Sequence, residues 1–220
     1  MIAQASLPDR GRIVPMTSNL SDPFERLGAV LRYAAGEEIY AQEEDADLIY
    51  RLVSGAVRAT RLLSDGRRQI SDFYFPGDMF GMENGPVHRT AAEALGDVEV
   101  LVVKRRALRL LGEDGAQVER MTWRSTGEQL ERAQDHMLLL ARKSACEKVA
   151  SFLAEIANRC ATPWALLPMS RQDIADYLGL TIETVSRMVT QLQQEGLVVF
   201  DGCRRFRIAH RGRLAERIAA

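Results

Sequence analysis

The side chains best suited to specific chemistry are Glu183 and Arg187, an acidic and a basic residue four positions apart in the stretch LTIETVSRMV. On a helix, side chains at this spacing are neighbours on one face. In the DNA major groove an arginine can donate to guanine O6 and N7, and a glutamate can accept from the cytosine amino group. The alternative is an exposed ion pair that contributes about a few tenths of a kcal/mol. We interpret the pair as base-reading, with Glu183 also orienting Arg187.

Two short helices joined by a tight turn would position this pair. The segment from Ser170 to Asp173 resembles a weak capping box that opens a helix over RQDIADYL, and Gly179 allows a tight turn into a second helix over about residues 181–194. Small Ala175 at the crossing and branched Val185 indicate a helix-turn-helix. The free face of its second helix holds Glu183, Thr184, Ser186, Arg187 and Thr190.

A hairpin and a basic stretch follow the second helix. GLVVF, Asp201-Gly202 and RRFRIAH predict two strands joined by a tight turn. Arginines in this stretch, Arg204 and Arg205 first among them, could hold phosphates without reading sequence. A solvated basic tail is the alternative. The full set is Arg204, Arg205, Arg207, Arg211, Arg213 and Arg217.

Upstream, residues 118–140 show a narrow apolar seam whose steps of three and four repeat over seven residues. Such a seam is typical of helix pairing and predicts a homodimer; burial against the chain's own barrel is the alternative. KSACEKVASFLAEIA predicts a further helix, which Pro163 and Pro168 prevent from continuing. The seam residues are Trp123, Thr126, Leu130, Ala133, Met137 and Leu140.

The region from about residue 30 to 105 consists of short alternating runs broken by glycine. Asp65-Gly66 predicts a hairpin turn, and Pro76-Gly77-Asp78 marks another. Several short antiparallel strands at this spacing favour a small barrel or sandwich. The first twenty or so residues show no periodicity, and we expect a flexible lead there.

Composition limits the function classes. The 29 basic and 30 acidic residues give a net charge of -1, so attraction to nucleic acid must come from a local patch. No apolar run is long enough for a membrane span and no signal-peptide core is present, so we expect a cytoplasmic protein. No triad, paired carboxylates, phosphate loop or metal-ligand spacing appears, and an enzyme is not predicted.

The order of glycine-rich barrel, long helix and helix-turn-helix with a hairpin wing resembles the CRP/FNR family of bacterial transcription regulators. The resemblance extends over nearly the whole chain after about residue 22. DIADYLGLTIETVSRMVTQLQQEGLV is similar to the FNR and FixK branches, and DHMLLLARKSACEKVASFL resembles their dimer-to-hinge helix. The family resemblance implies an α+β fold: an N-terminal lead (1–22), an antiparallel β-roll (23–114), a dimerisation helix (115–143) and a winged helix-turn-helix (144–220).

The resemblance also implies partners and site residues. It implies a homodimer that binds double-stranded DNA at a palindrome of TTGA-type half-sites, acts with RNA polymerase, and more often activates than represses. Ile182 and Ser186 stand where CRP-like helices carry arginine and glycine, which favours an FNR-like sequence preference. Base contacts would come from Glu183, Ser186 and Arg187, with Arg171, Gln172, Thr181 and Thr184 nearest to phosphate.

Family members commonly sense an effector through the barrel. FNR-type iron-sulfur clusters need N-terminal cysteines, but no cysteine precedes Cys146. Of the CRP-like cyclic nucleotide pocket, Gly81, Arg89 and Thr90 remain, whereas Met82 replaces the ribose-binding glutamate. We therefore expect a vestigial pocket. Arg89 with Thr90 could still bind an anion; an arginine that anchors a strand turn is the alternative.

Histidine and cysteine side chains leave further alternatives. Haem would need one of His88, His136 or His210, none of which has a supporting pattern, and we interpret His136 as solvent-facing. Cys203 lies among arginines that would favour its oxidation, although an inert turn cysteine is the alternative. Cys146 and Cys160 show no C-x-x-C spacing. We expect a FixK-like regulator without a cofactor; the alternative is gating by an unidentified small molecule or haem in the β-roll.

Overall fold

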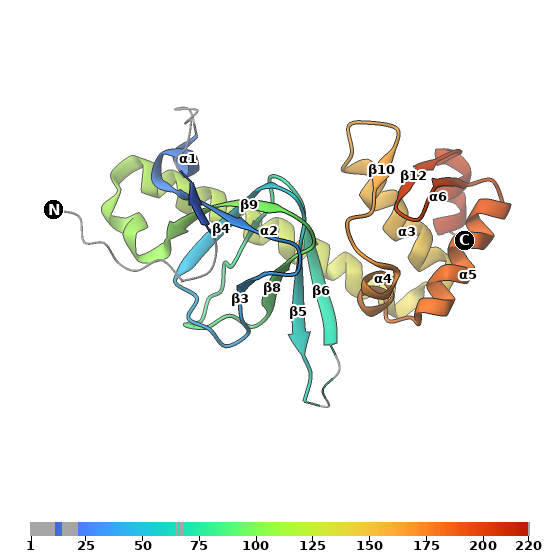
Figure 1. Cartoon of the computed structure of the whole chain (residues 1–220), viewed down its shortest axis with the longest axis horizontal. Helices are drawn as coiled ribbons and strands as arrows, with labels where there is room; N and C mark the ends of the chain where they lie inside the picture. Colours follow the sequence, from blue (N-terminus) through green and yellow to red (C-terminus); the bar gives the residue numbers. More distant parts are fainter. Residues whose placement is uncertain (1–11, 15–21, 65, 67, 220) are drawn as a thin grey trace. The chain divides into compact units, whose positions relative to one another are not determined.

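The structure is a computed structural model that describes residues 12–14, 22–64, 66 and 68–219. The chain divides into two compact units, one ending at Gln129 and the other beginning at Leu130 (Figure 1). In the described part, no helix combines the length and the apolar character that a membrane span requires. The mixed α+β class predicted from the sequence is confirmed.

In the part of the first unit that the structure describes, the strands form two antiparallel sheets. Among these described strands, the larger sheet has five in the order β1-β2-β9-β4-β7, and the smaller has four in the order β3-β8-β5-β6. Non-neighbouring strands of the sequence pair in both sheets, as expected of a β-roll. The strands are β1 (Arg12–Val14), β2 (Ala29–Tyr33), β3 (Glu38–Tyr40), β4 (Leu48–Ser54), β5 (Val57–Leu62), β6 (Arg68–Tyr74), β7 (Met79–Phe80), β8 (Ala91–Ala94) and β9 (Val98–Lys104).

Strand β9, whose sequence VEVLVVK is almost continuously apolar, is buried on both faces. Val100 and Val102 belong to the core cluster shared by the two sheets, and Leu101 and Val103 belong to a second cluster with Phe24 and the helices. Because side chains alternate across a strand, burial of both faces requires apolar residues at successive positions. The larger sheet is therefore the central layer of this unit.

The expected flexible lead is wrong at residues 12–14. They form β1, in which Ile13 lies opposite Leu31 of β2. Asp22 then caps helix α1 (Pro23–Leu27) by accepting a hydrogen bond from the Phe24 amide at 2.8 Å. Residues 1–11 and 15–21 lie outside the described residues.

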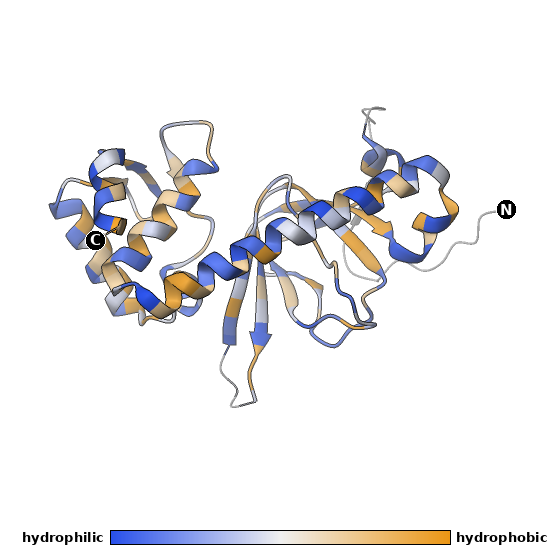
Figure 2. Cartoon of the chain, turned by 180° about the vertical axis from the view of Figure 1, so that it is seen from behind, coloured by the Kyte–Doolittle hydropathy of each residue, from blue (hydrophilic) through white to orange (hydrophobic). Residues whose placement is uncertain are grey.

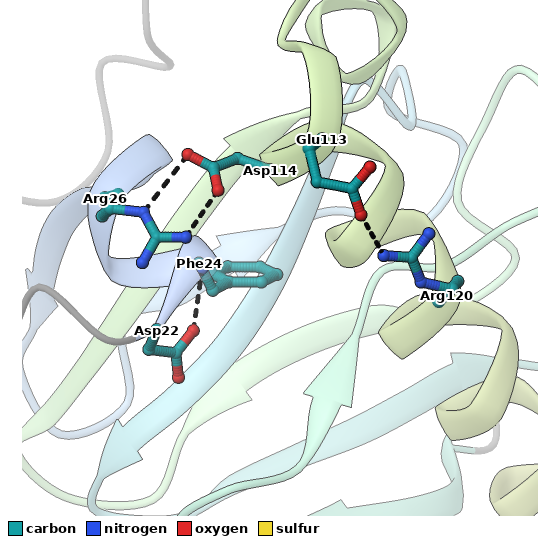
Figure 3. A network of polar contacts seen from close by, with 6 residues as sticks. All are labelled: Asp22, Phe24, Arg26, Glu113, Asp114 and Arg120. Carbon is teal, nitrogen blue, oxygen red and sulfur yellow. Dashed lines mark hydrogen bonds and ion pairs between the residues drawn. The ribbon is translucent and has the colours of Figure 1, made fainter.

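Helix α1 is tied to the start of the long helix α2 (Gly112–Arg142), which follows the 3-10 helix η1 (Arg105–Leu110). Figure 3 shows the Arg26 guanidinium donating to both carboxylate oxygens of Asp114, at 3.2 and 2.5 Å. Arg120 donates to Glu113, two helical turns before it, at 2.7 Å. Phe24 beneath these pairs is completely buried.

The second unit begins with the last turns of α2, which are mixed in hydropathy and become mainly hydrophobic only close to the end of the helix (Figure 2). Its wing is a three-stranded sheet in the order β10-β12-β11. Helices α3 and α4 begin with capping boxes at Ser144 and Ser170, and Thr181 caps α5. The elements are α3 (Ala145–Asn158), β10 (Ala165–Leu166), α4 (Arg171–Leu178), α5 (Ile182–Gln194), β11 (Val198–Asp201), β12 (Arg205–Ile208) and α6 (Arg211–Ala219).

Helix α6 changes the interpretation of the basic stretch. Arg211 donates to Asn158 Oδ1 at 2.7 Å, and Arg213 donates to the Glu195 carbonyl at 3.3 Å. Arg217 lies 3.7 Å from the Glu195 carboxylate. These three arginines are therefore not a solvated tail, because they join α6 to α3 and to the end of α5.

Candidate nucleic-acid interface

The turn between α4 and α5 sets the angle between these two helices. Gly179 adopts the left-handed conformation with φ 63° and ψ 41°, which glycine tolerates better than other residues, and its amide bonds to the Ala175 carbonyl. Leu180 donates to the same carbonyl at 3.0 Å. Ala175 and Val185 are completely buried, so their side chains close the contact between the two helices.

One face of α5 is buried and the opposite face is open. Val185, Val189 and Leu192 are buried, whereas Glu183, Ser186 and Arg187 are exposed. The three residues predicted to read bases thus share the solvent-facing side of the first two turns. A helix that enters the major groove reads base edges with these turns.

Arg187 is bound to a neighbour on its own helix. Its Nη2 donates to Thr184 Oγ1 at 3.4 Å, and that hydroxyl lies 3.1 Å from the Thr181 hydroxyl. The expected direct pairing with Glu183 is absent among the described contacts. The pKa of Glu183 is lowered by its own backbone amide, by Thr181 and, least, by the charge of Arg187. Thr184 is therefore the residue that orients Arg187, which sequence spacing did not indicate.

The residues predicted to contact phosphate lie on α4, at the start of α5 and on the wing. Arg171, at the first position of α4, is half-buried with its guanidinium 4.8 Å from the Phe200 ring centre, and burial lowers its pKa. Gln172 donates to Asp176 at 2.6 Å. Arg204 and Arg205 are exposed on the wing.

The helix seam is exposed along α2. The side chains of Trp123, Leu130 and Met137 are 82, 59 and 63 % exposed. Thr126 and Ala133 are exposed as well, and Leu140 is half-buried. Burial against the chain's own barrel, the alternative raised by the sequence, therefore does not account for these positions.

Two of the three predicted effector residues, Gly81 and Thr90, lie against an aromatic cluster in the β-roll. The Tyr40 hydroxyl bonds to the Thr90 side chain and the Gly81 backbone, and burial raises the pKa of Tyr40. A Cβ added to Gly81 would lie 2.7 Å from the Tyr50 ring. Arg89 is exposed, so the structure brings Gly81 and Thr90 together and leaves Arg89 at the surface.

Glu83 lies one position after the glutamate site of the family. The neighbouring His88 and the Arg89 amide lower the pKa of Glu83, although partial burial acts in the opposite direction. The Glu83 carboxylate is 3.6 Å from His88 Nδ1. Glu83 is thus engaged with its own loop.

The histidines and cysteines have defined surroundings. His88 is 1 % exposed and stacks on Tyr40 with ring centres 3.7 Å apart. His136 is half-buried and stacks on Tyr177 at 4.0 Å, so the solvent-facing interpretation is wrong; burial lowers its pKa. His210 is exposed.

The three cysteines differ in exposure: Cys146 is buried, Cys160 is half-buried and Cys203 is exposed. Within the described ranges, no three His, Cys, Asp or Glu residues are grouped for a metal ion.

Comparison with known proteins identifies both units. Residues 167–198 match the model of bacterial regulatory proteins of the crp family, and residues 30–114 match the cyclic nucleotide-binding domain. The nitrogen fixation regulation protein FixK of Azorhizobium caulinodans is 42 % identical over 86 % of this chain and 78 % of its own length. The chain belongs to the CRP/FNR family.

Further CRP/FNR relatives agree with this assignment. The transcriptional activatory protein AadR of Rhodopseudomonas palustris is 46 % identical over 83 % of this chain and 80 % of its own length. The solved structure of FixK2 from Bradyrhizobium japonicum superposes with a TM-score of 0.82 at 49 % identity, covering 88 % of this chain and 98 % of that one. The protein is a FixK-like, DNA-binding member of the family, and these relatives are regulators rather than enzymes.

Proposed function

We propose that this protein is a homodimeric transcription activator that binds a palindromic TTGA-type operator without a cyclic nucleotide or an iron-sulfur cluster. The observation that carries the proposal is the face of α5, where Glu183, Ser186 and Arg187 are exposed opposite a buried apolar face. This arrangement supplies an acceptor for cytosine and a two-pronged donor for guanine within reach of the major groove. The activator names of the relatives support the direction of regulation.

Effector-independent binding is supported by the contents of the β-roll. A cyclic nucleotide would need space beside Gly81 and free donors for its phosphate. Tyr50 closes the space at Gly81, Tyr40 occupies the Thr90 hydroxyl, and His88 stacks on Tyr40. The residues present therefore do not fit a cyclic nucleotide.

Dimerisation through α2 is supported by its exposed seam. Trp123, Leu130 and Met137 recur at the spacing of a two-stranded coiled coil, and a monomer would leave their apolar surface in water. Two-fold symmetry would place two α5 helices on two half-sites of a palindrome. The Leu130→Glu variant should be monomeric by sedimentation and should lose operator binding.

Footprinting tests the proposed function. Reduced protein without additive should protect both halves of a TTGA-type palindrome from nuclease digestion, and a template carrying this operator upstream of a promoter should be transcribed more strongly. Protection of neither half, or protection only after cAMP is added, would contradict the proposal.

One observation favours the effector-gated alternative. A cavity of about 570 Å³ lies outside the aromatic cluster, between η1, α2 and the segment after β7, and Arg89, Arg109 and Trp123 are among its lining residues. If this cavity takes a required ligand, exhaustively dialysed protein should leave no footprint and an extract of the cells that produced it should restore one.

A further inference from the structure

We propose that Trp164 holds Arg205 and Arg207 on the outer face of the wing sheet as a second contact to the DNA backbone, separate from the helix-turn-helix. The inference rests on the proposed DNA-binding function, and what it adds is a positioning role for Trp164. The guanidinium carbons of Arg205 and Arg207 lie 4.9 and 5.5 Å from the Trp164 ring centre. One indole therefore contacts two cations.

The register of the sheet explains this arrangement. Ala165 lies opposite Phe206 and Leu166 opposite Arg205, so Trp164 precedes the paired residues on the side of Arg207. Phe206 is completely buried, whereas Arg205 and Arg207 on either side of it are exposed. Alternation along β12 therefore points both arginines to one outer face while Phe206 anchors the strand in the core.

Contact with an aromatic face keeps these arginines available for an anion. A guanidinium that stacks on a ring uses its face, while its N–H donors point outward in the guanidinium plane. A carboxylate partner would instead occupy donors and neutralise charge. Arg207 has no carboxylate at ion-pair distance among the described residues, and Arg205 has only the exposed Asp201 at 3.4 Å. An exposed pair of this kind is weak and can be replaced by phosphate.

The spacing of the two arginines fits a nucleic-acid backbone. Residues two apart on a strand are separated by roughly 6.8 Å. This is close to the separation of neighbouring phosphates along one DNA strand. Arg204, in the turn just before β12, adds a third exposed positive charge, and Asp201 is the acidic residue paired across from Arg205. A phosphate chain matches this row in both charge and period.

The wing is physically continuous with the helix-turn-helix. Arg171 at the start of α4 lies over Phe200 of β11, and Phe200 stacks on Phe206 of β12 with ring centres 5.4 Å apart. Aromatic contacts thus connect Arg171, at the start of the first helix of the helix-turn-helix, with the strand that carries Arg205 and Arg207. DNA seated on α5 and extended past its half-site would run towards this sheet.

The salt dependence of binding by the full-length dimer tests the proposal. Affinity for the operator should be measured by fluorescence anisotropy across a salt series, on duplexes with long and with trimmed flanks. Log affinity falls as log salt rises, and each phosphate contact contributes about 0.9 to the magnitude of this slope, which is the quantity called the slope below. Arg207→Ala should lower this slope by roughly that amount per protomer on the long duplex, and should leave the preference over scrambled DNA unchanged.

Matched variants separate positioning from charge. Trp164→Leu, which keeps both arginines, should lower the slope on the long duplex, and Trp164→Phe should restore most of it. Arg124→Ala removes an exposed arginine that is paired with Glu128 on α2, and should change nothing. Thermal unfolding of each variant shows whether the fold is retained.

Three results would overturn the proposal in different ways. An unchanged slope for Arg207→Ala, with operator preference intact, would exclude the second backbone contact and leave the proposed function standing. A lower slope for Arg207→Ala but not for folded Trp164→Leu would exclude the role of Trp164. Failure of the unmodified protein to prefer the operator would contradict the proposed function itself, and the inference with it.

Discussion

Arg187 is oriented before any DNA is bound. Its guanidinium donates to Thr184, whose hydroxyl lies beside that of Thr181, the N-cap of α5. A long side chain that is already ordered loses less conformational entropy when it meets a base. The family resemblance alone assigned Thr184 to phosphate contact. Its hydrogen bond with Arg187 adds a second role, which is to orient the Arg187 side chain.

Loss of Arg187 should affect sequence preference more than loss of Thr184. Arg187→Ala should cost about 1–3 kcal/mol on the operator and relax the preference at one guanine. Thr184→Val removes only the orienting hydroxyl and should cost less, with part of that cost absent when Arg187 is already alanine. Anisotropy on operator and base-substituted duplexes measures both. Equal losses on operator and scrambled DNA for Arg187→Ala would refute base reading.

Gly81 is a position where the β-roll has no room for a side chain. Its φ is +73°, and an added Cβ would lie 2.7 Å from Tyr50 and 3.2 Å from the Leu48 carbonyl. Gly81→Ala should therefore destabilise the protein by about 1–3 kcal/mol through overpacking, with backbone strain in addition. Gly85→Ala is the matched control because nothing lies within 4 Å of its added Cβ. Equal melting temperatures for the two variants would contradict this account.

Among the helices, α1 is fixed by its buried ring more than by its ion pair. Phe24 is completely buried, whereas Arg26 and Asp114 remain partly open to solvent. Phe24→Ala should cost about 3–5 kcal/mol of unfolding free energy. Arg26→Ala should cost much less than Phe24→Ala, because exposed ion pairs are weak. Chemical denaturation of both variants measures the difference, and the reverse order would be inconsistent with this packing.

The contact between α2 and α4 predicts a pH dependence. Burial lowers the pKa of His136 below its ordinary 6.5, so the unfolded chain binds more protons than the folded one as pH falls through this value. Stability should therefore decrease between pH 7.5 and 5.5. Carboxylates with a lowered pKa, such as Glu83, reduce stability only at lower pH, because they become protonated in the unfolded chain first, from their ordinary pKa of 4.5 downward.

His136→Phe isolates this effect because it keeps a ring against Tyr177 and removes the titrating group. The variant should lose less stability than the unmodified protein between pH 7.5 and 5.5 in urea denaturation. Parallel pH profiles for the two proteins would show that His136 does not titrate differently on unfolding.

Local sequence patterns predicted several elements closely. The capping signal at Ser170, the turn at Gly179 and the hairpin around Gly202 depend on neighbouring residues, and the structure contains α4, α5, β11 and β12 at these places. Helix α6 and strand β1 were missed, because partners far away in the sequence stabilise them: Asn158 and Glu195 for α6, and β2 for β1. Periodicity does not reveal such contacts.

For the candidate site as well, the sequence predicted the local arrangement but not the contacts between elements. Helical spacing placed Glu183, Ser186 and Arg187 on one face, which is a consequence of local geometry. The ring contacts of Trp164, Phe200 and His136 depend on which elements pack together, so spacing alone could not supply them. A tryptophan one residue before a strand that pairs with arginines is the signal that could have indicated the wing surface.

For the chain as a whole, we expect the folded dimer to read DNA without a small effector. The most direct test is fluorescence anisotropy of reduced, effector-free protein at fixed salt, on a TTGA-type palindrome and on its scrambled control, before and after addition of cAMP. Specific binding is typically about 10³-fold or more tighter than non-specific binding. We expect a preference of this kind without additive and no change with cAMP. Binding that appears only with cAMP, or equal binding to the two duplexes, would contradict the claim.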